Sequence, residues 1–327
     1  MPIFKLVEAE EYYDALLQEI PRAKKRITVV TMVMLWGERT APLFELLETA
    51  VRRGVKVTLV LDNYTRLTYL QGLQRGTSGA ERLRRTFRAL EGLSAAGAHV
   101  VAVGKIGFPP QKGRCHVKAT VIDTVSYGFG GVNFMDENFK AVDYMLKSRD
   151  PEVADSLDQL VGKIMHNQPP LADAEVKLGG RTTLLFDGGR RGSSIIYERA
   201  CELSAQARRI RYASQMVPSG QLARLLNENG AQVYATRAEQ LGSVAGLAQA
   251  YDQQKFRIRN LYRGTGFIHA KVMLFELPGG RKALLSGSHN FSYRGVAFGT
   301  QELALESRDP ALWKQLDNFI QRRVTAG

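Results

Sequence analysis

The sequence predicts an α/β protein made of two tandem units that share one fold. Strand-like and helix-like segments alternate over short connections in both halves of the 327-residue chain, which is typical of α/β layers. A motif centred on His116 and Lys118 also recurs at His269 and Lys271, 153 residues further along. Two copies of one unit generally pack about a pseudo-twofold axis, so we expect equivalent segments to meet at their interface.

The elements of the first unit follow from hydrophobic periodicity. Apolar residues at helical spacing predict helices, and apolar runs rich in β-branched residues predict strands. Gly54 ends the second helix. The predicted order is helix 8–20, strand 27–34, helix 43–51, strand 55–61, an insertion at 63–79, helix 80–93, strand 98–103, a strand through the motif at 115–123, a strand at 142–146 and a helix after Pro151.

The predicted helix 80–93 carries four arginines beside an apolar face with Leu83, Phe87 and Leu90. A basic amphipathic helix of this kind can lie on an anionic membrane. An ordinary surface helix packed on its own sheet has the same pattern, and we favour that interpretation.

The second unit repeats this order. Prolines and glycines mark residues 169–181 as a linker between units at 1–168 and 182–327. The predicted order is helix 195–207, a strand led in by basic residues at 208–213, helix 222–228, strand 231–235, an approach to the second motif at 258–262, and a C-terminal helix after the segment 302–310.

The register between the two halves is kept beyond the motif. Asn133 and Asn290 are 157 residues apart, and Asp143 and Glu302 are 159 apart. Most of the increase arises in one hairpin, which is four residues longer in the second half. Matching positions over this distance indicate a duplicated unit.

The charge of the chain favours an anionic partner. The net charge is +13, which suits a phospholipid surface or nucleic acid and does not choose between them.

Two cysteines, Cys115 and Cys201, are too few for a disulfide framework or a thiolate metal site. The longest apolar stretch, 27–36, is too short to span a bilayer, and the N-terminus does not resemble a signal peptide. We therefore expect a cytoplasmic protein.

The duplicated motif places an imidazole beside an ammonium group. Residues i and i+2 of a strand point to the same face, so each histidine lies beside its lysine. Two imidazoles that titrate near neutral pH suit attack on phosphorus and protonation of the leaving oxygen. Lys118 and Lys271 supply positive charge for the non-bridging oxygens of a phosphate ester. A lone His-x-Lys tripeptide arises by chance, so the inference depends on both copies.

Further donors are predicted near each motif. Asn133 and Asn290 would offer amide groups from a neighbouring strand, and Ser288 adds a hydroxyl in the second half. Such donors stabilise the phosphorane transition state more than the substrate. We predict no metal and no cofactor, because the five histidines lack metal-site spacing with carboxylates and an adjacent lysine disfavours a cation.

A nucleophilic imidazole needs a partner that holds one tautomer. Asp143 and Glu302, each on the strand after its asparagine, are the candidates. Asp123 and Glu276 stand seven residues after their histidines, and this odd offset puts them on the other face of the strand. We assign these two a structural role in fixing the hairpin or neighbouring backbone.

The pattern His-x-Lys-x4-Asp-x6-Gly-Gly-x-Asn, with its second copy, resembles the phospholipase D superfamily over nearly the whole chain. The resemblance implies a mixed sheet flanked by helices in each half, a site at their interface, and a ping-pong reaction through a phosphohistidine with transfer to water or an alcohol. It implies a site formed by His116, Lys118, Asn133, His269, Lys271, Ser288 and Asn290, with Asp143 and Glu302 orienting the histidines. We take His116 as nucleophile and His269 as acid and then base. Glu276 departs from the usual Asp.

Within the superfamily, residues 215–219 and 263–271 are similar to segments of cardiolipin synthases, and Gly131 in place of Ser suits that branch. The resemblance thus implies a phosphatidyltransferase or phospholipase D acting on phospholipids. Since no membrane helix is predicted, the protein would dock peripherally on the inner membrane face. Basic charge and the apolar loop residues Leu67, Tyr69 and Phe108 would serve this docking.

Two alternatives stay open. A nuclease could use the same site, and the positive charge would suit it equally. The duplicated single chain favours lipid, because nucleases of this superfamily are often one-copy dimers. A non-catalytic scaffold that binds anionic lipid is the other alternative, and the two intact His-Lys pairs speak against it.

Overall fold

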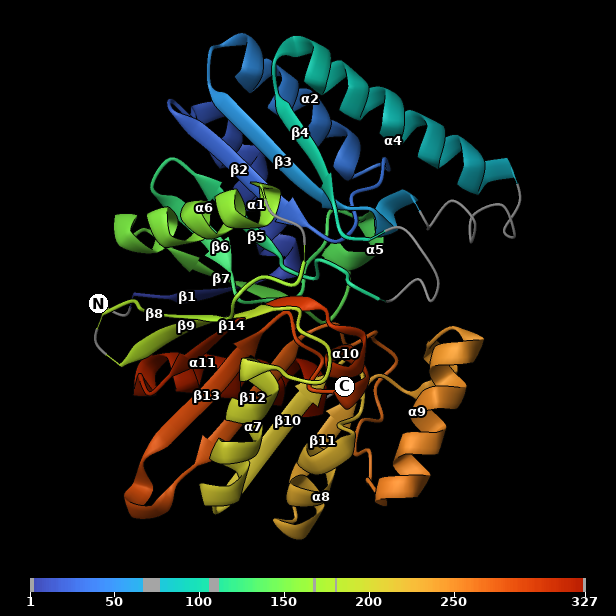
Figure 1. The fold of residues 1–327 in the computed structure, drawn as a ribbon, viewed down its shortest axis with the longest axis vertical. Coiled ribbons are helices and arrows are strands. Elements are labelled where there is room, and N and C mark those ends of the chain that lie inside the picture. Colours follow the sequence, from blue (N-terminus) through green and yellow to red (C-terminus); the bar gives the residue numbers. More distant parts are fainter. Residues whose placement is uncertain (1–2, 67–76, 106–111, 167–168, 180, 326–327) are drawn as a thin grey trace.

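The computed structural model describes residues 3–66, 77–105, 112–166, 169–179 and 181–325. Its strands form two seven-stranded mixed sheets, one in each half of the chain. Figure 1 shows the first sheet, in blue and green, above the second, in yellow-green to red, with helices packed on both. The predicted class, two α/β units that each hold a mixed sheet flanked by helices, is confirmed.

The first sheet has the order β1-β7-β6-β5-β2-β3-β4, and the second has the order β11-β10-β12-β13-β14-β9-β8. The strands are β1 Lys5–Glu8, β2 Arg26–Thr31, β3 Lys56–Asp62, β4 His99–Val103, β5 Ala119–Ile122, β6 Val125–Gly128, β7 Tyr144–Ser148, β8 Ala174–Lys177, β9 Thr182–Gly188, β10 Arg209–Ser214, β11 Gln232–Ala235, β12 Lys271–Glu276, β13 Lys282–Gly287 and β14 Gln301–Ser307.

The α-helices are α1 Ala9–Glu19, α2 Thr40–Arg52, α4 Thr77–Ala96, α5 Asp136–Phe139, α6 Pro151–His166, α7 Ile195–Gln206, α8 Gly220–Glu228, α9 Ser243–Phe256, α10 Tyr293–Phe298 and α11 Pro310–Ile320. Short helical turns lie at η1 Ile20–Arg22, η2 Ala238–Gln240, η3 Pro278–Gly280 and η4 Gln321–Thr325. Among these, α5, α9 and α10 were not predicted from the sequence. No helix within the described ranges is long and apolar enough to cross a bilayer.

The order of the strands shows the duplication. Strands β1, β7, β6, β5, β2 and β3 correspond in order and relative direction to β9, β14, β13, β12, β10 and β11. The equivalent parallel pairs, β2 with β3 and β10 with β11, are each joined by a crossover helix, α2 or α8, and the first unit adds a further parallel pair, β3 with β4. Residues 169–181, predicted to be a linker, contain β8, which pairs with β9. The predicted unit boundaries stay a prediction.

One hydrophobic core lies between the two units. It joins Tyr144 and Leu146 of the first unit to Leu305 and Phe319 of the second. The rings of Tyr144 and Phe319 meet edge to face at 5.0 Å, and the Tyr144 hydroxyl lies 2.6 Å from that of Ser286. Because β5 and β12 both contribute to this core, the two motifs lie at one interface.

Helix α4 packs on its own unit. Leu83 and Leu90 are buried, and the helix contacts α2 and β4. The interpretation as an ordinary surface helix is therefore confirmed. Leu67, Tyr69 and Phe108, which we expected to contact a membrane, lie outside the described residues.

A buried ion pair holds the segment that leads to His116. Arg114 Nη1 lies 2.9 Å from Asp62 Oδ1, and both side chains are almost fully buried. Asp62 also accepts from the backbone N–H groups of Tyr64 at 2.6 Å and Cys115 at 2.5 Å. Burial raises the pKa of Asp62 to about 6, although Arg114 and these N–H groups oppose the rise. The carboxylate thus depends on Arg114 to stay ionised at neutral pH.

We expect Arg114→Met to lower the free energy of unfolding by about 3 kcal/mol, because removing one partner leaves a buried group uncompensated. Urea unfolding of the variant and the unaltered protein measures this difference. Arg52→Met is the matched control, since Arg52 pairs with Glu48 on an exposed helix surface and should contribute less than about 1 kcal/mol. Equal losses in the two variants would contradict the expectation.

Candidate active site

The backbone of each motif leaves its own sheet at the histidine. The strand predicted over 115–123 is wrong in its first half, because β5 begins only at Ala119. Instead, Cys115 bridges to Gln301 of the other unit, and His116 N–H donates to Gln301 O at 2.8 Å. In the second motif β12 begins at Lys271, and His269 lies before it.

The second motif makes the equivalent contact across the interface. Val142 bridges to Ile268, and the N–H groups of His269 and Ala270 both donate to Val142 O at 3.0 Å. Each histidine is therefore held by the backbone of the other unit, directly beside the carboxylate that the other unit carries.

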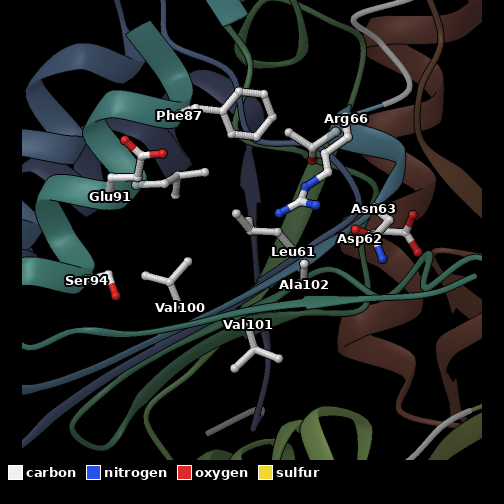
Figure 2. Close-up of a pocket in the computed structure, with 12 residues that line it drawn as sticks. Leu61, Asp62, Asn63, Arg66, Phe87, Glu91, Ser94, Val100, Val101 and Ala102 are labelled. Carbon is white, nitrogen blue, oxygen red and sulfur yellow. The ribbon is translucent and has the colours of Figure 1, made fainter. Parts of the chain in front are cut away.

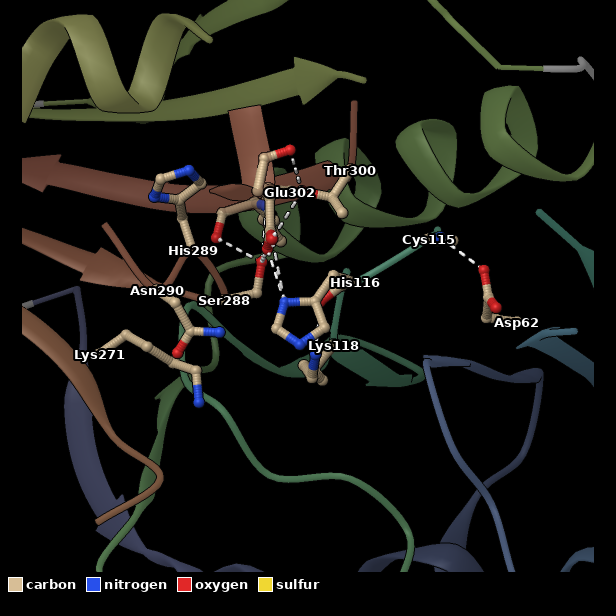
Figure 3. Close-up of polar contacts among 12 residues, drawn as sticks. Asp62, Cys115, His116, Lys118, Lys271, Ser288, His289, Asn290, Thr300 and Glu302 are labelled. Atoms are coloured by element: carbon tan, nitrogen blue, oxygen red, sulfur yellow. Dashed lines mark hydrogen bonds and ion pairs between the residues drawn. The ribbon is translucent and has the colours of Figure 1, made fainter. Parts of the chain in front are cut away.

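Each imidazole pairs with a carboxylate across the interface. His116 Nδ1 lies 2.9 Å and 3.0 Å from the two carboxylate oxygens of Glu302, and Figure 3 shows this contact. His269 Nδ1 lies 2.7 Å from Asp143 Oδ2. A carboxylate beside Nδ1 accepts a hydrogen bond from the N–H there and leaves the Nε2 lone pair free, so both rings are held in the tautomer that a nucleophile or base requires.

Both lysines are buried beside their histidines. Lys118 Nζ donates to His116 O at 2.6 Å, and Lys271 Nζ donates to His269 O in the same way. Burial lowers the pKa of Lys118 to about 7 and that of Lys271 to about 8, while the carboxylates Asp143 and Glu302 oppose this. A phosphate anion placed between them would favour the protonated ammonium groups.

Burial lowers the pKa of His116 and of His269 to about 4, in spite of their carboxylate partners. Burial acts to raise the pKa of Glu302, but the charge and hydrogen bond of His116 hold it at about 2. The resting state near neutral pH therefore has neutral imidazoles, the nucleophilic form, beside an ionised Glu302.

Stability is expected to fall as the pH falls from about 6.5 to about 4. Unfolded histidines bind protons near 6.5, whereas His116 and His269 bind them near 4 in the folded protein. Across this window the unfolded state holds more protons, so acid favours unfolding. Thermal melts over this range measure the slope. A His116→Asn/His269→Asn double variant should show a shallower slope, and identical slopes would contradict the assignment.

The predicted amide donors do not lie on strands. Asn133 and Asn290 occupy the loops that follow β6 and β13, which corrects their predicted place on strands. Asn133 Oδ1 accepts from the Thr31 hydroxyl at 3.2 Å, which leaves the Asn133 amide hydrogens available. Asn290 Oδ1 is buried and has no hydrogen-bond partner in the described part of the chain.

Ser288 forms a hydrogen bond with the carboxylate of Glu302. Its hydroxyl donates to Glu302 Oε2 at 2.5 Å and accepts from the Leu303 N–H at 3.0 Å. Its counterpart Gly131 donates its N–H to Asp143 Oδ1 at 3.2 Å. A Cβ at position 131 would lie 2.5 Å from His269 O and 2.6 Å from Asp143 Oδ2, so only glycine fits there.

Asp123 and Glu276 lie away from the histidines. Asp123 accepts from the backbone N–H groups of Lys24, Lys25 and Arg26 at 2.8–3.1 Å, which fixes the start of β2 against the β5–β6 turn. Glu276 pairs with Lys282 at 3.0 Å across the β12–β13 hairpin.

Sequence reasoning missed several residues around the site. Thr300 donates to Glu302 Oε1 at 3.2 Å, and Asp62 with Arg114 fixes the approach to His116. His289 is buried, and its Nδ1 accepts from Phe291 N–H at 2.9 Å. Its position between Ser288 and Asn290 was a signal, whereas no sequence pattern marked Arg114.

A cavity of about 240 Å³ lies between α4 and the β3–β4 edge of the first sheet. Figure 2 shows its lining, which includes Leu61, Phe87 and Val100. Asp62, which holds Cys115, lies at its border. The cavity is therefore linked to His116 through Asp62, which lines the cavity and accepts from the N–H of Cys115, the residue before His116.

The sequence profile of a family described as the cardiolipin synthase, phospholipase D-like domain matches residues 16–165. No curated protein matches the chain significantly. Among solved structures, phosphatidylserine synthase from Haemophilus influenzae Rd KW20 matches with a TM-score of 0.70 at 16% identity, covering 98% of this chain and 87% of that one.

Two further solved structures are similar. Polyphosphate kinase from Porphyromonas gingivalis matches with a TM-score of 0.60 at 13% identity, covering 97% of this chain and 50% of that one. A phospholipase D family member, Nuc from Salmonella typhimurium, matches with a TM-score of 0.35 at 17% identity, covering 49% of this chain and 91% of that one. At these identities the matches to phosphatidylserine synthase and polyphosphate kinase show the fold alone.

The fold and the site define a duplicated α/β protein whose two units build one paired histidine–lysine centre. Residues 16–165 match a phospholipase D-like domain of the cardiolipin synthase type, and the chain as a whole has the fold of the solved phosphatidylserine synthase.

Proposed function

We propose that this protein is a phosphodiesterase or phosphatidyltransferase that acts on phospholipids through a phosphohistidine intermediate. The observation that carries the proposal is the crossed pairing of His116 with Glu302 and His269 with Asp143. It commits both Nδ1 atoms to carboxylates and leaves both Nε2 atoms for chemistry at one phosphorus.

In the first half-reaction, His116 Nε2 attacks phosphorus and the bond to the leaving alcohol oxygen breaks. His269 donates its Nε2 proton to that oxygen. His269 is protonated at this stage because the negative charge of the bound phosphate raises the pKa of its imidazole. The phosphoryl group is then held on His116.

In the second half-reaction, neutral His269 takes a proton from water or an alcohol, whose oxygen attacks the phosphohistidine. The phosphorus–nitrogen bond breaks, and His116 returns to its neutral form. Lys118, Lys271 and the amide of Asn133 bind the non-bridging oxygens, which carry more negative charge in the transition state than in the substrate.

Two observations support a lipid over a nucleic acid as substrate. The matched family is described as the cardiolipin synthase, phospholipase D-like domain, and the full-length structural match is a phosphatidylserine synthase. The cavity beside the approach to His116 has an apolar part that includes Leu61, Phe87 and Val100, and this part suits a segment of an acyl chain. The net charge of +13 suits an anionic membrane surface and nucleic acid equally, so it does not decide between the two substrates.

The deciding experiment incubates the protein with mixed phospholipid vesicles and, separately, with single-stranded DNA, both with a chelator, and identifies products by mass spectrometry. We expect released head groups or lipid-to-lipid transfer. DNA cleavage without any lipid product would make the protein a nuclease. Vesicle binding without any product would favour the scaffold alternative.

A further inference from the structure

Helix α9 (Ser243–Phe256) presents apolar side chains to solvent. Val244, Leu247 and Tyr251 are 79%, 74% and 57% exposed, and they are three of the five exposed large hydrophobic side chains in the described part of the chain. Their spacing of i, i+3 and i+7 places them on one face of the helix.

The inner face of α9 is polar. Gln249 is fully buried and Asp252 is 5% exposed. A helix that packs on a hydrophobic core has the opposite arrangement, with apolar residues inside and polar residues outside. The side chains of α9 are thus arranged for an apolar environment on its outer side, and Figure 1 shows the helix, in orange, at the edge of the second unit.

Buried hydrogen bonds of Gln249 fix α9 near the second motif. Its Oε1 accepts from Val217 N–H at 3.1 Å, and its amide donates to Thr236 O. The Thr236 hydroxyl in turn donates to the carbonyl of Ile268, the residue before His269, at 2.7 Å.

Asp252 makes the second anchor. Its carboxylate pairs with Arg294 at 2.9 Å, and Arg294 also donates to Ala248 O at 2.9 Å. Arg294 belongs to α10, which follows Asn290 by three residues. Both anchors therefore hold α9 at the end of the second sheet where Lys271 begins β12.

The surroundings of α9 are basic. Residues 237–263 hold five Lys and Arg against two Asp and Glu, and one of the acids, Asp252, is buried against Arg294. The Lys255 ammonium lies 5.4 Å from the ring centre of Tyr251, so a cation stands at the end of the apolar stripe. Apolar residues flanked by cations are the pattern by which interfacial helices bind anionic bilayers.

We propose that α9 docks this protein on the surface of a bilayer that contains anionic phospholipids, with Val244, Leu247 and Tyr251 entering the head-group region and the flanking basic residues on lipid phosphates. This inference rests on the proposed function, in which the substrate lies in such a bilayer. Docking there brings the second motif to the membrane surface.

The test is flotation of the full chain with vesicles of equal parts phosphatidylglycerol and phosphatidylcholine. The triple variant Val244→Gln/Leu247→Gln/Tyr251→Gln should bind at least ten-fold more weakly than the unaltered protein. Vesicles of phosphatidylcholine alone should also bind the unaltered protein at least ten-fold more weakly. Val176→Gln, at an exposed apolar residue on β8, is the matched control and should leave binding unchanged.

The outcomes separate this inference from the proposed function. Vesicle binding that depends on α9 supports docking even if no lipid product forms, which would overturn the proposed function alone. If lipid products form, the variant should lose at least ten-fold more activity on vesicles than on a monomeric short-chain phospholipid. Unchanged vesicle binding by the triple variant overturns the docking proposal. A dimer that becomes a monomer in that variant, with vesicle binding kept, would make a second copy of the chain the partner of α9.

Discussion

Replacing His116 with asparagine is expected to reduce phospholipid turnover by at least ~10⁴-fold, because the proposed nucleophile is removed and no other group takes its place. The fold should remain, since asparagine is polar and smaller than the imidazole it replaces. Product formation followed by mass spectrometry, with circular dichroism for the fold, measures both effects.

The matched control is His99→Asn, because His99 is exposed on β4 and lies outside the site. It should leave turnover unchanged. Full activity of His116→Asn would show that the proposed mechanism is wrong.

The two histidines can also be distinguished. With a substrate whose leaving group needs no proton, His269→Asn should accumulate a phosphoryl adduct on His116, because the base that activates water is missing. Peptide mapping under alkaline conditions, in which phosphohistidine survives, locates the adduct. An adduct on His269 in the His116→Asn variant would reverse the proposed roles.

Replacing Glu302 with glutamine is expected to reduce turnover by roughly 10²–10⁴-fold, although in the proposed mechanism Glu302 does not contact the substrate. An amide at Nδ1 no longer enforces the proton there, so the ring of His116 can adopt the tautomer with hydrogen on Nε2. The carboxylate charge that stabilises an imidazolium is lost as well. Asp143→Asn should have the same effect through His269.

Glu276→Gln is the matched control for this effect, because Glu276 is the motif carboxylate that pairs with Lys282 on the hairpin. It should change kcat by less than about two-fold, because this half-buried hairpin pair contacts neither histidine and contributes little as an isolated ion pair. If Glu276→Gln lost as much activity as Glu302→Gln, the assignment of the orienting carboxylates would be overturned.

Much of the fold could be predicted because the signals are local. The alternation of apolar strands and amphipathic helices gave the α/β class and most elements to within a few residues. The exceptions are informative. The strand predicted through His116 begins only at Ala119, because the residues before it bond to Gln301 of the other unit. Helix α9 was missed, because its buried face carries Gln249 and Asp252 in place of an apolar stripe.

The sequence by itself determined the duplication and the set of polar residues that the two units bring together. A fixed offset between His116 and His269, and between Lys118 and Lys271, is visible in one dimension. Only the tertiary structure decided that Glu302 serves His116 and Asp143 serves His269. Periodicity reports which face of an element is buried, but not which unit buries it. The crossed pairing arises where each histidine segment leaves its own sheet and bonds to the other unit's backbone, a contact between residues 126 and 186 positions apart that no local pattern encodes.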